Sequence, residues 1–286
     1  MHTTAILRVR AADCGISQPA FSARIRNLET TLGVSIVQRG NRFLGFTSEG
    51  ERVVCWAHWI LADLEGMRQE LAQAKGTLAG KLTIGCVPTT LSFASAISGS
   101  LRASFPDLVI LIRSASSNTI RADLETMAMD VGITYLDVAF PKHMETRALY
   151  EERYVLLAPP GLSPRKTGTA TWAEAADLPL CLLSPEMHNR QIVDAIFADQ
   201  GLAPQPVIET NAFSAALAQV AGGGAATIAP ERLATDQLES GRAVRLALNE
   251  PDVTKPIGLV SLDRQPELPA VEALVRLIDA TGVDHL

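Results

Sequence analysis

The stretch ISQPAFSARIRNLETTL, residues 16–32, decides how the first part of this chain folds. Its apolar side chains recur at helical spacing and form one face: Phe21, Ile25, Leu28 and Leu32. Ser17 is a suitable N-cap, and Pro19 is tolerated because it falls in the first turn. Gly33 ends the pattern, so we predict one amphipathic helix.

The same helix carries a polar stripe of side chains that recur every four residues: Gln18, Ser22 and Arg26. Such side chains meet base edges and phosphates when a helix lies in the major groove, although an amphipathic helix is more often ordinary core. Residues 36–46 favour the DNA-binding interpretation, because they form two short strand-like runs around a tight turn. Arg39 and Arg42 flank that turn, where they would contact a phosphate backbone.

Together these residues resemble the winged helix-turn-helix of LysR-type transcriptional regulators. The matching positions are Ser17-Gln18-Pro19-Ala20-Phe21-Ser22, Leu28-Glu29, Leu32-Gly33-Val34, Arg39, Arg42, Phe46-Thr47 and Glu49-Gly50. The resemblance implies a DNA-binding head over 1–50 that contacts promoter DNA through Ser17, Gln18, Pro19, Ser22, Arg26, Arg39 and Arg42.

The resemblance also implies a full helix before the turn motif, and here only residues 1–10 precede it. We therefore expect the first helix of the head to be missing, in whole or large part. This leaves an alternative function open: an effector-binding module whose truncated head no longer binds DNA.

Charge is distributed unevenly along the 286 residues. The net charge is −6, but residues 1–50 hold six arginines against three carboxylates and carry +3, which leaves −9 for the rest. A basic head on an acidic body is what neutralisation of a DNA backbone requires. The cysteines form no pair and no metal spacing, which indicates reduced thiols in a cytoplasmic protein: Cys14, Cys55, Cys86 and Cys181. The uncharged run 210–230 is too polar for a membrane span.

A long helix is predicted after the strand pair, because Ser48 and Glu51 can form a capping box. Apolar residues then recur at steps of four and three: Val53, Ala57, Ile60, Leu64, Met67, Leu71, Ala74 and Leu78. A seam of this length favours a partner helix over packing within one domain. We predict a linker and dimerisation helix over 51–78, and a homodimer or homotetramer that assembles through it and the effector domain. Gly76 and Gly80 bracket a predicted hinge.

Beyond residue 80, predicted strands alternate with predicted helices, which is typical of a parallel α/β sheet. The pattern occurs twice, and the resemblance implies a two-lobed effector domain like the periplasmic binding proteins. We expect lobe I over 81–158 plus 259–286 and lobe II over 159–258. The fold class is therefore α/β, with a winged helix-turn-helix head, a long linker helix and a two-lobed effector domain.

Ligands of open α/β sheets bind beyond the carboxyl ends of strands, where helix N-termini favour anions. The candidates at these ends are Pro88, Thr89, Thr90, Ser116, Ser117, Thr134, Arg190 and Asn211. Each has a plainer interpretation, since Ser, Thr and Asn cap ordinary helices and Arg190 fits a solvated helix charge equally well. We expect them to bind a small anion, with a carboxylate as the first candidate, between the two lobes.

No catalytic constellation is visible in the sequence. The histidines have no metal-ligand spacing: His2, His58, His143, His188 and His285. No Gly-x-Ser-x-Gly turn and no phosphate-binding loop is present. An α/β enzyme therefore ranks below a regulator, and we predict no catalytic residue, no metal and no cofactor.

Overall fold

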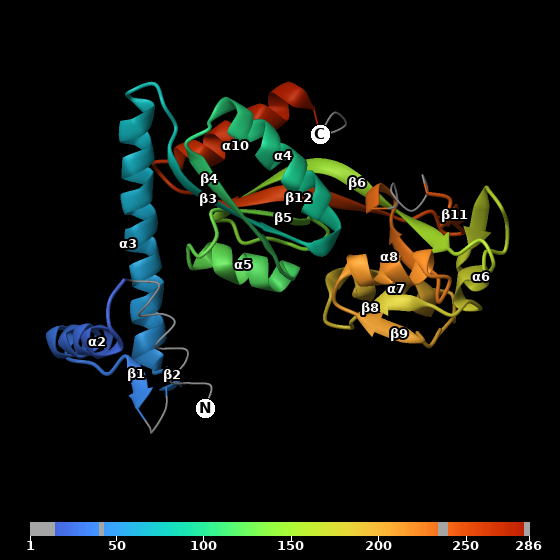
Figure 1. Ribbon diagram of the computed structural model, residues 1–286, viewed down its shortest axis with the longest axis horizontal. Helices are drawn as coiled ribbons and strands as arrows, with labels where there is room; N and C mark the ends of the chain where they lie inside the picture. The colour runs from blue at the N-terminus through green and yellow to red at the C-terminus, as the bar shows by residue number, and fades with distance from the viewer. Residues whose placement is uncertain (1–14, 40–42, 234–239, 283–286) are drawn as a thin grey trace. The chain divides into compact units, whose positions relative to one another are not determined.

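The computed structural model describes residues 15–39, 43–233 and 240–282 (Figure 1). The chain divides into two compact units, Met1–Leu64 and Glu65–Leu286. The division falls inside α3 (Ser48–Gln73), so each unit is described by itself.

The first unit contains α2 (Gln18–Leu32), the helix predicted from the opening stretch. Ser17 caps it, because its Oγ accepts a hydrogen bond from the Ala20 N–H at 3.4 Å. Pro19 lies in the first turn, and Gly33 ends the helix in the left-handed conformation, with φ of 69°. The local signals for this helix are therefore confirmed.

A two-stranded wing follows, formed by β1 (Val37–Arg39) and antiparallel β2 (Phe43–Phe46). Glu29 of α2 holds the start of the wing, because its Oε1 accepts from the backbone N–H of Ile36 at 2.8 Å. Gly50 in the first turn of α3 lies so close to the Ile36 carbonyl that a Cβ would clash with backbone. α2, the wing and the start of α3 are thus held together by short-range contacts.

The linker helix differs from the prediction at its end. α3 stops at Gln73 rather than at residue 78, and a turn follows in which Gly76 has φ of 81°. Leu78 continues the apolar period in the sequence, but it lies buried in the core of the second unit. The apolar period therefore passes from a helix face to a core position without any break in the pattern.

Side chains from the last turns of α3 form hydrogen bonds across the predicted hinge at Gly76 and Gly80. These turns belong to the second unit. Gln69 is fully buried: its Nε2 donates to the Lys81 carbonyl at 2.9 Å, and its Oε1 accepts from the Ala270 N–H at 3.1 Å. Glu65 accepts from the Lys81 N–H at 2.9 Å. The last turns of α3 are thus anchored to the strand after the turn and to the C-terminal helix.

Replacing Gln69 with leucine should lower the free energy of unfolding by about 1–3 kcal/mol, because a carbonyl and an N–H would be left buried without partners. Chemical denaturation of the full chain measures this. Gln73→Leu on the exposed surface of the same helix is the matched control. Equal stability of the two variants would contradict the anchoring role of Gln69.

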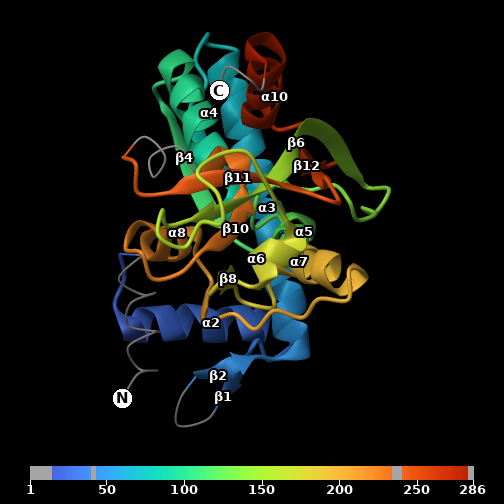
Figure 2. The same ribbon diagram turned by 90° about the vertical axis from the view of Figure 1, so that its right-hand side faces the viewer.

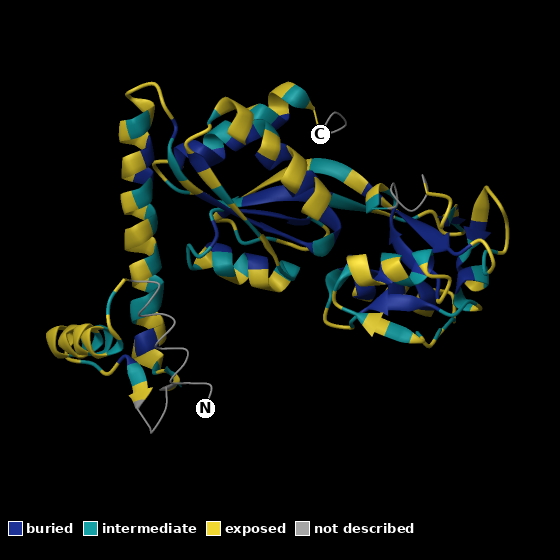
Figure 3. Ribbon diagram, in the orientation of Figure 1, coloured by how far each residue is buried: buried dark blue, intermediate teal, exposed yellow. Residues whose placement is uncertain are grey.

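Lobe I is built on β3 (Gly80–Cys86), β4 (Leu108–Ser114), β5 (Val131–Tyr135), β12 (Thr254–Leu262) and the first part of β6 (Met144–Ala158). β3 pairs in parallel with β4 and β5, whereas β12 lies antiparallel between β5 and β6. α4 (Leu91–Ser104) and α10 (Pro269–Thr281) cover one face of this sheet, and α5 (Ser117–Glu125) covers the other (Figures 1 and 2). β3, β5 and the middle of β12 form the buried layer, whereas β4 and the first half of β6 are mostly exposed (Figure 3).

Lobe II contains β7 (Thr169–Thr171), α6 (Trp172–Ala176), β8 (Cys181–Leu183), α7 (His188–Asp199), β9 (Ile208–Thr210), α8 (Phe213–Ala221), β10 (Thr227–Pro230) and β11 (Val244–Asn249). β8 and β9 form a separate parallel pair, and β10 and β11 both pair antiparallel with β6. The α/β class and the two lobes are as predicted.

β6 runs without a break through both lobes. Residues 144–153 pair with β12, and residues 154–158 pair with β10 and β11. The side chains at the middle of β6 therefore lie where the two lobes meet.

Candidate DNA-binding head and effector site

The polar stripe of α2 reaches solvent in the structure. Gln18 and Ser22 are half-buried and Arg26 is exposed, whereas no residue of α2 is buried. Leu28 and Leu32 of the predicted apolar face are also exposed. Arg42 and the whole of residues 1–14, where the expected loss of the first helix falls, lie outside the described residues.

Several predicted effector residues make short-range hydrogen bonds. Ser116 caps α5, with its Oγ 3.2 Å from the Thr119 N–H. Thr134 donates to Ser117 Oγ at 2.9 Å, and Thr90 donates to the Val87 carbonyl at 3.0 Å. The first bond closes the start of α5, the second joins β5 to α5, and the third lies in the connection from β3 to η1 (Pro88–Thr90). They match the plain capping interpretation, and each hydroxyl also keeps acceptor capacity for a ligand.

Pro88 and Thr89 form the start of the short helix η1 (Pro88–Thr90), which leads directly into α4. Asn211 is exposed in the other lobe, two residues before α8 begins. The connection from β3 to α4 and the connection from β9 to α8 are therefore present, as the candidate residues require.

Arg190 is neither a solvated charge nor an exposed side chain. It is 8% exposed on α7, where its Nε donates to Asp194 and its Nη1 donates to Glu209, both at 2.7 Å. Nη1 also lies 2.7 Å from the Leu183 carbonyl. This guanidinium holds α7 against the β8–β9 pair.

The buried carboxyl group of this region belongs to a residue that the sequence analysis did not select, Glu152. It is 4% exposed on β6 and accepts a hydrogen bond from the Tyr135 hydroxyl at 2.6 Å. Asn189 of α7 donates to the hydroxyls of Tyr135 at 3.3 Å and Tyr154 at 3.4 Å. Thr89 joins the cluster, with its Oγ1 3.4 Å from the Tyr135 hydroxyl. The five side chains connect lobe I, β6 and lobe II.

Burial dominates the electrostatics of this cluster. It raises the pKa of Glu152 to about 7, although hydrogen bonds from Tyr135, Thr89 and Tyr154 act in the opposite direction. Burial, together with the nearby Glu152, also raises the pKa of Tyr135 and of Tyr154. Glu152 therefore holds a proton far more readily than an exposed glutamate.

A second link between the lobes lies beside the cluster. His188 Nε2 of α7 is 3.0 Å from Asp137 Oδ1, just after β5, and Lys255 Nζ is 3.3 Å from Asp137 Oδ2. The His188 ring also lies edge-on to Tyr135, with 4.9 Å between ring centroids. The start of α7 is thus tied to the end of β5 by polar and aromatic contacts.

A cavity of about 180 Å³ opens beside Glu152. It is lined by Thr89, Tyr150, Glu151, Glu152, Arg153, Pro230, Glu231 and Arg232. The Arg232 guanidinium lies over the Tyr150 ring, 4.6 Å from its centroid. Of the predicted effector residues, the structure places only Thr89 in the wall of this cavity.

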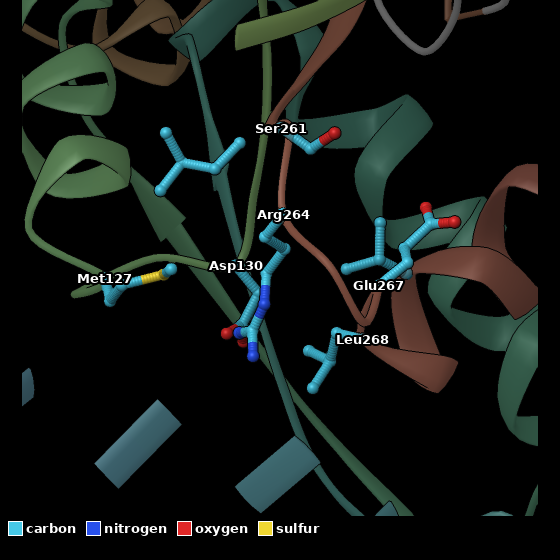
Figure 4. Close-up of a pocket in the computed structure, with 8 residues that line it drawn as sticks. Met127, Asp130, Ser261, Arg264, Glu267 and Leu268 are labelled. Atoms are coloured by element: carbon cyan, nitrogen blue, oxygen red, sulfur yellow. The ribbon is translucent and has the colours of Figure 1, made fainter. Parts of the chain in front are cut away.

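Figure 4 shows another, much smaller pocket in lobe I, where Arg264 lies beside Asp130. Its volume is about 20 Å³, which is room for one water and not for an effector. Asp130 Oδ2 accepts from the Thr83 N–H at 2.6 Å, and burial raises the pKa of this carboxyl. This pocket is therefore too small to be the effector site.

Two thiols of the second unit are buried. Cys86 and Cys181 are both inaccessible, and burial raises the pKa of Cys86 to about 11 and also raises that of Cys181. Reactive cysteines are exposed and have lowered pKa values. Among the residues described, no group of His, Cys, Asp and Glu is arranged to hold a metal ion. None of the described helices is long and apolar enough to cross a bilayer.

The chain is similar along most of its length to known regulators. The DNA-binding transcriptional dual regulator OxyR of Escherichia coli K12 is 26% identical over 278 residues, which cover 96% of this chain and 91% of that protein. The hydrogen peroxide-inducible genes activator of Haemophilus influenzae is 33% identical over 126 residues, which cover 43% of this chain and 42% of that protein.

Solved structures share the fold. CbnR complexed with its target DNA matches with a TM-score of 0.70 at 19% identity, over 98% of this chain and 96% of that chain. Residues 10–51 match the model of the bacterial regulatory helix-turn-helix protein, lysR family, and residues 75–282 match the LysR substrate binding domain. Because these two models cover the head and nearly all of the second unit, the chain belongs to the LysR family of transcriptional regulators.

Proposed function

We propose that this protein is a sequence-specific, promoter-binding regulator of the cytoplasm whose DNA binding responds to a small anion held between its lobes. The observation that carries the proposal is the pairing of a capped helix and wing in one unit with a polar cavity at the junction of two lobes in the other. The first supplies groups for a major groove and a phosphate backbone. The second supplies an enclosed site for a ligand.

The linker helix supports assembly as a homodimer or homotetramer. Side chains of the predicted seam stay exposed in the single chain, with Ile60 at 64%, Met67 at 51% and Leu71 at 58%. Trp56 and Trp59 lie next to them and are exposed as well. A row of large apolar side chains on a helix is covered by a partner helix in a coiled coil.

Relatives named as peroxide-inducible activators suggest a second function, a direct response to peroxide. Such a response requires an accessible thiolate. Within the second unit, the buried Cys86 and Cys181, with their raised pKa values, do not provide one. Cys55 on α3 is half-buried, and Cys14 lies outside the described residues. For the second unit we therefore favour a bound effector.

Substitutions in the head separate the two kinds of DNA contact. Gln18→Ala and Ser22→Ala should relax base preference, whereas Arg39→Ala and Arg42→Ala should weaken binding to every sequence and flatten its salt dependence. Titration of promoter and unrelated DNA at two salt concentrations measures both effects. Absence of binding by the full chain at low salt would support the alternative, a module with a truncated head.

Binding of a small anion is tested separately. A thermal-shift assay compares the unliganded chain with the chain in the presence of small carboxylates, both unsubstituted and carrying further polar groups. We expect a subset to stabilise the chain through donors at the helix N-termini, which favour anions by about 0.3–1 kcal/mol each. Ser116→Ala removes the cap of α5 and lowers the unliganded melting temperature, so its effect on the effector is measured as a smaller ligand-induced shift above the variant's own unliganded value. Asn211→Ala tests the contribution of the other lobe. A panel in which no carboxylate stabilises the chain would reject the anion.

A further inference from the structure

The cavity beside Glu152 is small and strongly polar. Its volume of about 180 Å³ lies below the roughly 300–1,000 Å³ of pockets for drug-sized ligands. Five of its eight lining residues are acidic or basic: three are glutamates and two are arginines. A ligand that fits here has few atoms and meets several charges.

Two of these five lining charges are compensated by ion pairs. Arg153 pairs with Asp252 at 2.9 Å, and Glu231 pairs with Arg245. Glu152 differs from them, because it is buried and its hydrogen bonds come from hydroxyl groups. Within the described parts of the chain, Glu152 has no ion-pair partner of opposite charge.

We propose that Glu152 is the counter-charge for a protonated nitrogen of the effector, so that the effector is a small zwitterion with an ammonium and a carboxylate group. This inference rests on the proposed function, which places an anionic group of the effector at the helix N-termini. It adds the cationic group and so distinguishes amino acids and related amino-carboxylates from simple organic acids.

The argument is one of charge balance in a buried site. A buried carboxylate without a cation is costly, and an ammonium group that reaches it offsets this cost. A simple carboxylate placed beside Glu152 would either repel it or require that it stay protonated. A ligand with an ammonium group meets neither obstacle.

The groups around Glu152 do not supply that charge themselves. Those on the neighbouring elements are Thr89 of η1, Cys86 of β3, Tyr135 of β5 with Asp137 after it, Tyr150, Glu151, Arg153 and Tyr154 of β6, His188 and Asn189 of α7, Glu231 and Arg232 of η2 (Glu231–Leu233), and Lys255 of β12. Lys255 is the cross-strand neighbour of Glu152, but its ammonium group lies against Asp137.

The first test is a thermal-shift panel on the full chain. It uses the standard amino acids, the matched acids without the amino group, and the matched amines without the carboxyl group. We expect stabilisation by a subset of the amino acids, and binding at least about 30-fold weaker for their deaminated acids, the size of effect seen when one partner of a buried charge pair is removed.

Two variants make this test specific. Glu152→Gln keeps the shape and a hydrogen-bond acceptor for Tyr135 but removes the charge, and it should lose the preference for amino acids. Glu145→Gln, at an exposed position of the same strand outside the cavity lining, should keep it. An amino acid that binds Glu152→Gln within threefold of wild type would overturn the proposal, as would a panel in which no amino acid binds.

The second test needs no variant. Because burial raises the pKa of Glu152 to about 7, part of this carboxyl is protonated near neutral pH, and pairing with a cation drives the proton off. Calorimetry in two buffers of different ionisation enthalpy should then show net proton release on binding. Proton uptake, or no exchange, would overturn the cationic group.

The outcomes separate this inference from the proposed function. If simple acids bind best and take up a proton, the zwitterion is wrong but the anion-responsive regulator stands. If neither acids nor amino acids bind, while promoter DNA is bound, the effector class fails and the DNA-binding function does not.

Discussion

Leu64→Asp is expected to convert the assembled protein into a monomer while both units stay folded. Leu64 lies at the centre of the seam on α3 and is already 38% exposed in the single chain, so the aspartate meets no clash there. In a paired helix the same carboxylate would be buried without a partner, which costs several kcal/mol. A symmetric dimer would bear that cost twice.

Sedimentation at micromolar concentration measures the result, and far-UV circular dichroism checks that the chain stays folded. Gln73→Asp is the matched control, because it places the same charge on the same helix at an exposed position outside the seam. We expect this control to assemble like wild type. A wild-type chain that sediments as a monomer would exclude pairing through α3 altogether.

Where the sequence predicted structure correctly, the signals were local. Ser17, Pro19 and Gly33 define the ends of α2 by chemistry that acts within one turn. The end of α3 was placed five residues too late, because Leu78 keeps the apolar period although it packs into lobe I. No periodicity distinguishes a seam position from a core position.

β6 shows the same limit for strands. Its first half is mostly exposed and has no apolar alternation, and it becomes a strand because β12 pairs with it from more than a hundred residues away. β12 also pairs with β5, which places this late segment of the chain in lobe I. Pairing between distant segments is a property of the fold and leaves little trace in one strand.

The effector residues were selected from helix N-termini, and that rule overlooked the centre of the cluster. Tyr150, Glu152 and Tyr154 alternate along β6 and share one face with the buried Leu156. A glutamate at an alternate position of a strand, on the same face as buried residues, was the available signal for a functional carboxyl. Thr89 was among the selected residues and lies in this cluster, but its partners Tyr135 and Glu152 come from two strands that sequence spacing does not bring together.

Glu152→Gln should raise the stability of the unliganded protein above neutral pH. The pKa of Glu152 is about 7 in the folded chain against an ordinary 4.5, so the folded state binds the proton more tightly than the unfolded state. The stabilisation from this proton is complete below pH 4.5 and is lost as the pH rises to 7 and beyond. A shift of this size corresponds to about 3 kcal/mol, which the ionised carboxylate costs the folded state above pH 7.

Glutamine has no proton to lose, so the variant lacks this component of the pH dependence. We expect thermal unfolding of wild type and Glu152→Gln to converge near pH 5, and the variant to unfold several degrees higher at pH 8. Glu151→Gln should follow wild type at both values, because its carboxylate is exposed. If Glu152→Gln tracked wild type across this range, Glu152 would be ionised in the folded chain at little cost. The buried carboxyl would then already be compensated, and it would have no need of a cation from the effector.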